Sequence, residues 1–181
     1  MLLFASVLLS TSFALQPFDP SVPSAVRAPF DARAALESPN RHVRSQDRSV
    51  RQLLKRGFTY SPTFRNLMAR IEKSDVIVYV EEVPRLPGGL EGRMMILPNA
   101  HGTRYVRIQL AMRGSPDDTV AVLGHELQHA LEVADEPWVS DQATMAALYQ
   151  RIGIGSLSGH HVYDTLAAQE IGRIVRRELL A

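Results

Sequence analysis

The sequence of 181 residues contains no cysteine. This absence excludes disulfide bonds, a thiol nucleophile, a cysteine-ligated metal and a lipid-modified cysteine behind a leader. The chain also lacks an excess of charge of one sign, because 20 basic and 19 acidic residues leave a formal net charge of +1. The overall charge therefore suggests neither a nucleic acid nor a membrane surface as partner. Hydrophobic residues make up 45% of the chain, which is enough for one domain with a sizeable core.

Long apolar runs are also missing, apart from the stretch MLLFASVLLSTSFALQ at the amino terminus. This stretch is too short to span a bilayer comfortably, and it ends in small residues. Ser12 and Ala14 stand at the −3 and −1 positions of a cleavage site before Leu15. We interpret residues 1–14 as a secretory signal peptide, although no basic residue precedes the apolar run; a buried N-terminal helix is the alternative. The sequence thus predicts a secreted or periplasmic protein with no transmembrane span after cleavage.

Residues 15–46 are rich in proline, alanine and arginine. Prolines at 17, 20, 23, 29 and 39 forbid a long regular element, so we expect a linker or flexible arm there and a folded domain over residues 47–181. Basic residues recur between positions 41 and 56 and could contact an anionic polymer. A solvated basic helix face is the interpretation that we prefer for them.

The hydrophobic pattern of residues 47–181 predicts an α+β domain. Helical spacing appears in 49–57, ended by Gly57, and again after the N-cap Ser61. Strands are expected at 76–83, 93–98 and 103–111, the last with one polar face. Ser115 then caps a helix that runs to Pro137, and helices over 140–153 and about 163–181 follow. We therefore expect a small, mostly antiparallel sheet packed on the helix that starts after Ser115, with further helices at both ends of the domain.

The helix after Ser115 carries the pattern HELQH, in which His125 and His129 lie four residues apart. Residues at this spacing are separated by roughly 40° around a helix and about 6 Å along it, so both imidazoles share one face. One Zn²⁺ can bind both rings, with Zn–N distances near 2.1 Å. Glu126 lies on the flank and can act as general base towards a water that zinc makes more acidic. The pattern therefore combines two ligands and a base within little more than one turn.

An ordinary amphipathic helix is the alternative explanation of this pattern. Its apolar stripe would comprise Val120, Leu123, Leu127, Ala130, Leu131 and Ala134. His125 and His129 would then lie on a solvent-facing polar side with Asp118, Glu132 and Glu136. Two histidines are an unusual choice for solvation, so we favour the metal site.

The chain resembles the zincin metallopeptidases over about residues 60–180. The resemblance lies in the HELQH pattern and in the order of the elements, a sheet followed by the helix that carries the pattern. The stretch GHELQHALEVA is also similar to small secreted bacterial proteins whose activity is not known. The resemblance implies that His125 and His129 bind zinc and that Glu126 is the general base. It further implies that strand 103–111 borders the cleft as an edge strand, where an extended substrate pairs with it by strand addition.

The third ligand is less clear from the sequence. The metzincin pattern would place Glu132 and Asp135 at its next two positions, but Glu132 provides no bend, and Asp135 lies about 9 Å further along the helix than His129. Gluzincins take a carboxylate from a later helix, which favours Asp164, with its N-cap role as the plainer alternative. Glu132 remains as an alternative ligand or as a hydrogen-bond partner of an imidazole, and Glu170 is the third candidate.

These residues predict an enzyme that hydrolyses peptide bonds with Zn²⁺ as cofactor and a peptide or protein as substrate. His161 and Tyr163, with the adjacent His160, are candidates to stabilise the oxyanion, although loop histidines are more often simply exposed. Two alternatives stay open. One is a non-catalytic exported binding domain with a structural or absent metal, and the other is an amidase acting on cell-wall peptides. The oligomeric state cannot be read from the sequence.

Overall fold

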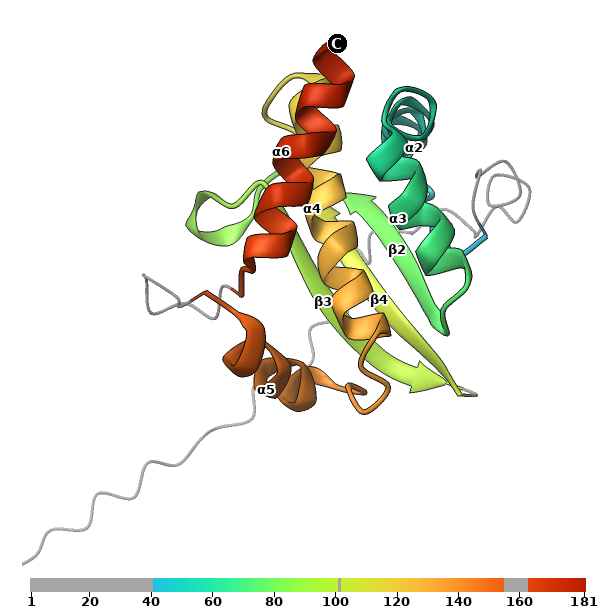
Figure 1. The fold of residues 1–181 in the computed structure, drawn as a ribbon, viewed down its shortest axis with the longest axis vertical. Helices are drawn as coiled ribbons and strands as arrows, with labels where there is room; N and C mark the ends of the chain where they lie inside the picture. Colours follow the sequence, from blue (N-terminus) through green and yellow to red (C-terminus); the bar gives the residue numbers. More distant parts are fainter. Residues whose placement is uncertain (1–40, 101, 155–162) are drawn as a thin grey trace, which may run out of the picture.

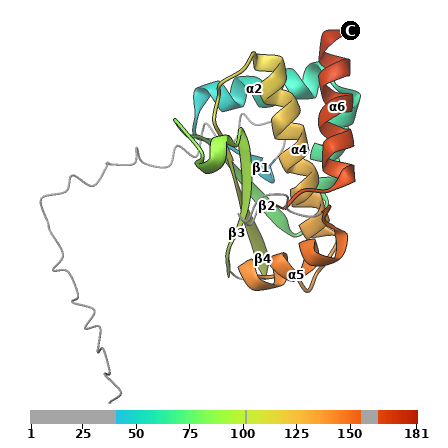
Figure 2. The same ribbon diagram turned by 90° about the vertical axis from the view of Figure 1, so that its left-hand side faces the viewer.

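The computed structural model describes residues 41–100, 102–154 and 163–181. The expected signal peptide at 1–14, most of the expected arm at 15–46, and the candidates His160 and His161 lie outside these residues. The described part is an α+β domain in which helices pack on one face of a four-stranded sheet (Figures 1 and 2).

The sheet has the order β1-β2-β4-β3, with β1 (Val43–Arg44), β2 (Val76–Glu82), β4 (Thr103–Leu110) and β3 (Gly92–Ala100). The β1–β2 and β2–β4 pairs are parallel, and only β3–β4 is antiparallel. The expectation of a mostly antiparallel sheet is therefore wrong. The strand order is the reason, because β4 inserts between β2 and β3 and so runs in the same direction as β2.

Strand β1 shows that the folded domain starts earlier in the sequence than expected. Val43 is fully buried and pairs with Val78 of β2, so the expected arm over residues 15–46 ends in a strand of the sheet. The folded domain thus begins before the expected boundary at Asp47, where helix α2 (Arg48–Tyr60) has its N-cap.

Gly57 does not end the first helix, as the sequence suggested, because α2 continues through it to Tyr60. A Cβ atom at residue 57 would lie 2.8 Å from Cδ1 of Phe64, so the glycine allows the fully buried Phe64 ring to pack against α2. Helix α3 (Pro62–Glu72) begins as predicted, with the Ser61 side chain accepting a hydrogen bond from the Phe64 amide.

The remaining helices follow the sheet. Pro87–Gly89 form a short 3-10 turn, η1, before β3. Helix α4 (Pro116–Ala134) carries the HELQH pattern and is capped by Ser115, as predicted. Helix α5 (Gln142–Ile152) and helix α6 (Leu166–Leu180) follow. Helix α4 crosses the face of the sheet, and α6 lies along α4 (Figure 1).

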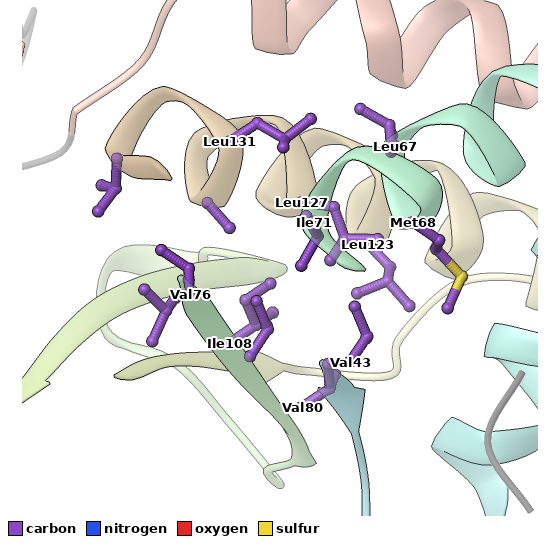
Figure 3. Packing of buried hydrophobic residues seen from close by; sticks show 14 of the residues in the cluster. Val43, Leu67, Met68, Ile71, Val76, Val80, Ile108, Leu123, Leu127 and Leu131 are labelled. Carbon is purple, nitrogen blue, oxygen red and sulfur yellow. The ribbon is translucent and has the colours of Figure 1, made fainter. Parts of the chain in front are cut away.

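The core lies between the sheet, α3 and α4 (Figure 3). Alternate residues of β2 and β4 point into it, which confirms the period of two read from the strand at 103–111. Leu123, Leu127 and Leu131 of α4 meet them from above and are at most 1% exposed. Each such leucine contributes roughly 1.5–3 kcal/mol by leaving water, so this packing holds α4 firmly on the sheet.

Arg104 fixes the carboxyl end of α4 to the sheet. Its side chain is 5% exposed, and it donates hydrogen bonds to the carbonyl oxygens of Val133, Ala134, Glu136 and Val139 at 2.7–3.1 Å. The same guanidinium binds both carboxylate oxygens of Asp75, at 2.8 and 2.6 Å. A cation at the carboxyl end of a helix satisfies its unpaired carbonyls and interacts favourably with its dipole, so Arg104 stabilises the end of α4.

Within the described ranges, none of the helices has the length and apolar character that crossing a membrane requires.

Candidate metal centre

Helix α4 turns the polar side of the HELQH pattern towards the protein interior. His129 is 3% exposed and Glu126 is 7% exposed, and the His125 side chain retains 25% of its surface. The solvent-facing alternative is therefore wrong, because α6 covers this side of α4. Gly124 of α4 allows the two helices to pack closely, since a Cβ atom there would lie 3.1 Å from Cγ2 of Val175 in α6.

Asp164 joins the two histidines from the segment before α6. Its Oδ1 lies 3.6 Å from Nε2 of His125. One potential ligand atom from each of His125, His129 and Asp164 lies within 4.8 Å of the others. Asp164 is not the N-cap of α6, because Thr165 takes that role by accepting a hydrogen bond from the Ala168 amide. The Asp164 carboxylate is thus available to face the imidazoles.

Two separations in this triad are close to those expected around one small cation. The Nε2 atoms of His125 and His129 are 3.1 Å apart. Two ligands on a tetrahedral zinc ion are separated by roughly 3.4 Å when each bond is near 2.1 Å. The observed separations of 3.1 and 3.6 Å lie on either side of this value. The donor set of two imidazoles and one carboxylate is also one that zinc binds, and it leaves a fourth position open.

Neighbouring groups orient both imidazoles. Nδ1 of His129 lies 2.7 Å from Oε2 of Glu132, so this nitrogen donates to the carboxylate and Nε2 presents its lone pair to the triad. The His125 ring hydrogen-bonds to the backbone of Ala168. Glu132 is therefore the hydrogen-bond partner of an imidazole, which was one of its two expected roles. Its other oxygen accepts a hydrogen bond from the hydroxyl of Thr165 at 2.7 Å.

Burial and neighbouring charges shift the pKa values of these groups. Burial raises the pKa of Glu126 to about 7. Burial also lowers the pKa of His125, and the charge of His129 adds to this effect. Burial alone would lower the pKa of His129, but its hydrogen bond to Glu132 and the nearby carboxylates raise it above the ordinary value. Buried titratable groups with shifted pKa values cluster at functional sites, which makes this group a candidate for one.

The triad opens into a cavity of about 800 Å³ between α4, α6 and β3. His129 contacts the ring of Tyr149 edge to face at 5.3 Å, and Tyr149 stacks on Tyr163 at 5.1 Å. The tyrosines, together with Met94 and Met145, contribute an aromatic and apolar lining to the cavity. Arg173 and Arg176 of α6 contribute charged groups to its lining.

Strand β3 forms one wall of the cavity, whereas the sequence suggested strand 103–111. That expectation is wrong because β4 pairs on both sides and has no free edge. Among the described residues, β3 pairs only with β4. The Ala111 amide donates a hydrogen bond to the Glu91 carbonyl opposite it. In an antiparallel pair every second residue bonds to the partner strand, so the backbone groups of Gly92 and Met94 point away from β4, to the open edge. The backbone of Met94 hydrogen-bonds to Glu126, which places the carboxylate at this edge.

The other candidate acids lie elsewhere. Glu170 is on an exposed face of α6, where it pairs with Arg173 and Arg177. Asp135 is exposed at the end of α4 and binds Arg70 at 2.9 Å. Of the candidates to stabilise the oxyanion, Tyr163 lines the cavity, and the two histidines are outside the described residues.

Sequence reasoning missed three residues at this site. Tyr149 lies on the buried side of α5, where an aromatic residue is equally compatible with core packing and with a cleft. Thr165 was overlooked because Asp164 is an equally good N-cap by residue type. Gly92 gave no local signal at all, because its role depends on how close β3 comes to α4.

Comparisons with protein-family models, with curated proteins and with solved structures found no match for this chain.

Proposed function

We propose that this protein is a zinc-dependent peptidase whose metal ligands are His125, His129 and Asp164. One observation carries the proposal: two imidazole nitrogens and a carboxylate oxygen converge within 4.8 Å in a cavity, next to a buried glutamate. Three of these four groups come from the HELQH pattern, and the fourth, Asp164, lies 35 residues after His129. The zincin resemblance of the sequence supports the same function and remains part of the proposal.

The chain's own groups would divide the reaction between them. An extended peptide would add to the open edge of β3, where the outward backbone groups of Gly92 and the carbonyl of Met94 can pair with it, since the Met94 amide already donates to Glu126. A zinc ion held by the triad would lower the pKa of a water molecule and polarise the scissile carbonyl. Glu126 would take the proton from the attacking water and deliver it to the leaving nitrogen. Tyr163 is the described candidate to donate a hydrogen bond to the developing oxyanion.

The position of Glu126 fits this role. Its carboxylate flanks the imidazoles without being part of the triad, and the backbone of Met94 fixes it beside the edge where the substrate would lie. Burial raises its pKa to about 7, so the group can both accept and release a proton near neutral pH. A cation bound to the triad would shift this pKa back down, towards the ionised base that the reaction needs.

Hydrolysis by the purified full chain, with one equivalent of zinc, tests the proposal. Casein and a soluble peptidoglycan digest are supplied side by side, so that a cell-wall amidase would be recognised by its products. We expect new amino termini from casein, and a loss of roughly 10²- to 10⁴-fold in rate for Glu126→Gln. Glu170→Gln, on the exposed face of α6, serves as the matched control and keeps the wild-type rate. Wild-type activity in the Glu126 variant would contradict the assignment.

Export is a further part of the proposal, and it depends on the apolar residues 1–14. Expression of the full chain in a secreting host, followed by sequencing of the mature amino terminus, tests it. Cleavage before Leu15 is the expected result, and a chain retained with residues 1–14 intact would contradict export by this route.

A further inference from the structure

Thr165 makes two hydrogen bonds through one hydroxyl. Its Oγ1 accepts from the Ala168 amide at 3.0 Å and thereby caps α6. The same hydroxyl donates to Oε1 of Glu132 at 2.7 Å. The residue is 3% exposed, so water cannot easily replace either bond. Thr165 therefore links the start of α6 to the helix that carries both histidines.

Hydrogen bonds connect the first turn of α6 to each of the three proposed ligands, directly or through one other side chain. Asp164 is the residue immediately before Thr165, and its Oδ1 accepts a hydrogen bond from the Thr165 amide at 2.7 Å. His125 hydrogen-bonds to the backbone of Ala168. His129 donates to Glu132, whose other oxygen is held by the Thr165 hydroxyl.

We infer that Thr165 is the positioning residue of the metal centre. It touches no ligand atom of either histidine. Its hydroxyl instead keeps the first turn of α6 helical and keeps Glu132 aligned with Nδ1 of His129, so that all three ligands face one point. This inference rests on the proposed metal binding and adds to it the group that organises the site before the metal arrives. Outer partners of this kind typically change metal affinity by about 10- to 100-fold when they are removed.

Ser61 offers a matched control within the same chain. Like Thr165, it is an N-cap whose Oγ accepts an amide three residues ahead, from Phe64 at 3.0 Å. Like Thr165, it also donates to a carboxylate, that of Glu178. It is fully buried, but it caps α3 and contacts none of the metal ligands. Ser61→Ala therefore reports the loss of a cap and a buried hydroxyl without the link to His129.

The experiment measures zinc affinity, by competition with a chelator, and the visible absorption of the cobalt-substituted protein. For Thr165→Val we expect a zinc Kd raised by about 10- to 100-fold and a changed cobalt spectrum. Thr165→Ser keeps the hydroxyl and should have the wild-type zinc affinity and cobalt spectrum. Ser61→Ala should lower the melting temperature without changing the zinc affinity or the cobalt spectrum. Wild-type zinc affinity and cobalt spectrum in Thr165→Val would overturn the inference while leaving the proposed metal site intact. A wild-type protein that binds no zinc would overturn both.

Glu132→Gln keeps the inference testable if Thr165→Val does not fold. This variant keeps the cap on α6 and weakens the same link from the other side. We expect its zinc affinity to fall and its cobalt spectrum to change, with α6 still docked. An unchanged affinity in this variant would contradict a role for the Thr165–Glu132–His129 chain.

Discussion

Gly92 lies directly against the carboxylate of Glu126: a Cβ atom at residue 92 would stand 2.5 Å from Oε1 of Glu126 and 2.8 Å from Cγ1 of Val122. The lack of a side chain thus lets strand β3 approach α4 at the point where the backbone of Met94 binds the proposed base. The edge strand and the base are placed by the same close contact.

Gly92→Ala should therefore separate metal binding from catalysis. The added methyl group displaces the Glu126 carboxylate, and a misplacement of about 1 Å costs on the order of 10²-fold in rate. Zinc affinity stays at the wild-type value, because no ligand moves. Both quantities are measured on one preparation. Asn99→Ala is the control, since Asn99 is exposed on the same strand and does not line the cavity; equal losses of activity in the two variants would count against the contact.

Asp164→Asn should weaken zinc binding by more than the roughly 10- to 100-fold that removal of an outer partner costs. The amide has no negative charge and competes poorly for zinc, while the fold around it changes little because the side chain is partly exposed. Glu170→Gln on the same helix should bind zinc as the wild type does. Titration of both variants with zinc provides the measurement. Wild-type affinity in Asp164→Asn would show that the third ligand is another group, with Glu132 the nearest candidate.

Arg104→Met should lower the free energy of unfolding by about 3 kcal/mol, because buried carbonyl oxygens at the end of α4 lose a charged donor. Urea denaturation measures the change. Arg70→Met provides the comparison, since Arg70 and Asp135 form an exposed pair worth under about 1 kcal/mol. Equal effects of the two substitutions would mean that Arg104 does not anchor the helix.

The Arg104–Asp75 pair predicts a pH dependence of stability. The hydrogen bond from Arg104 lowers the pKa of Asp75 below its ordinary value. The pair therefore stabilises the fold fully above the unfolded pKa of about 3.9, and this contribution is lost as the pH falls through the lower folded value. Wild type should be more stable than Asp75→Asn at neutral pH, by about 1 kcal/mol because Asp75 is half exposed, and the difference should shrink under acid. A difference that grew at low pH would contradict this sign.

The local features of the site could be predicted from the sequence because they depend on helix geometry alone. The spacing of four positions from His125 to His129 places both rings on one face, and Ser115 with Pro116 marks where that helix begins. These predictions needed no knowledge of the neighbouring elements. The same holds for the alternation of β4, whose even-numbered residues fill the core.

Features that depend on how distant segments meet could not be derived in this way. The order of β2, β4 and β3 is a matter of topology, and consecutive strands alone suggested a meander with antiparallel neighbours. Asp164 was one of three candidate acids until the docking of α6 on α4 separated it from Glu170. Gly57 resembled a helix stop, and only the position of the Phe64 ring explains why the helix continues.

Calorimetric titration of the purified chain with zinc tests the central claim most directly. The account predicts one zinc ion bound per chain in the wild type, and loss of that binding in both His125→Ala and His129→Ala, with the unloaded proteins still folded by circular dichroism. A wild-type chain that binds no zinc, or histidine variants that bind it as tightly as the wild type, would contradict the account.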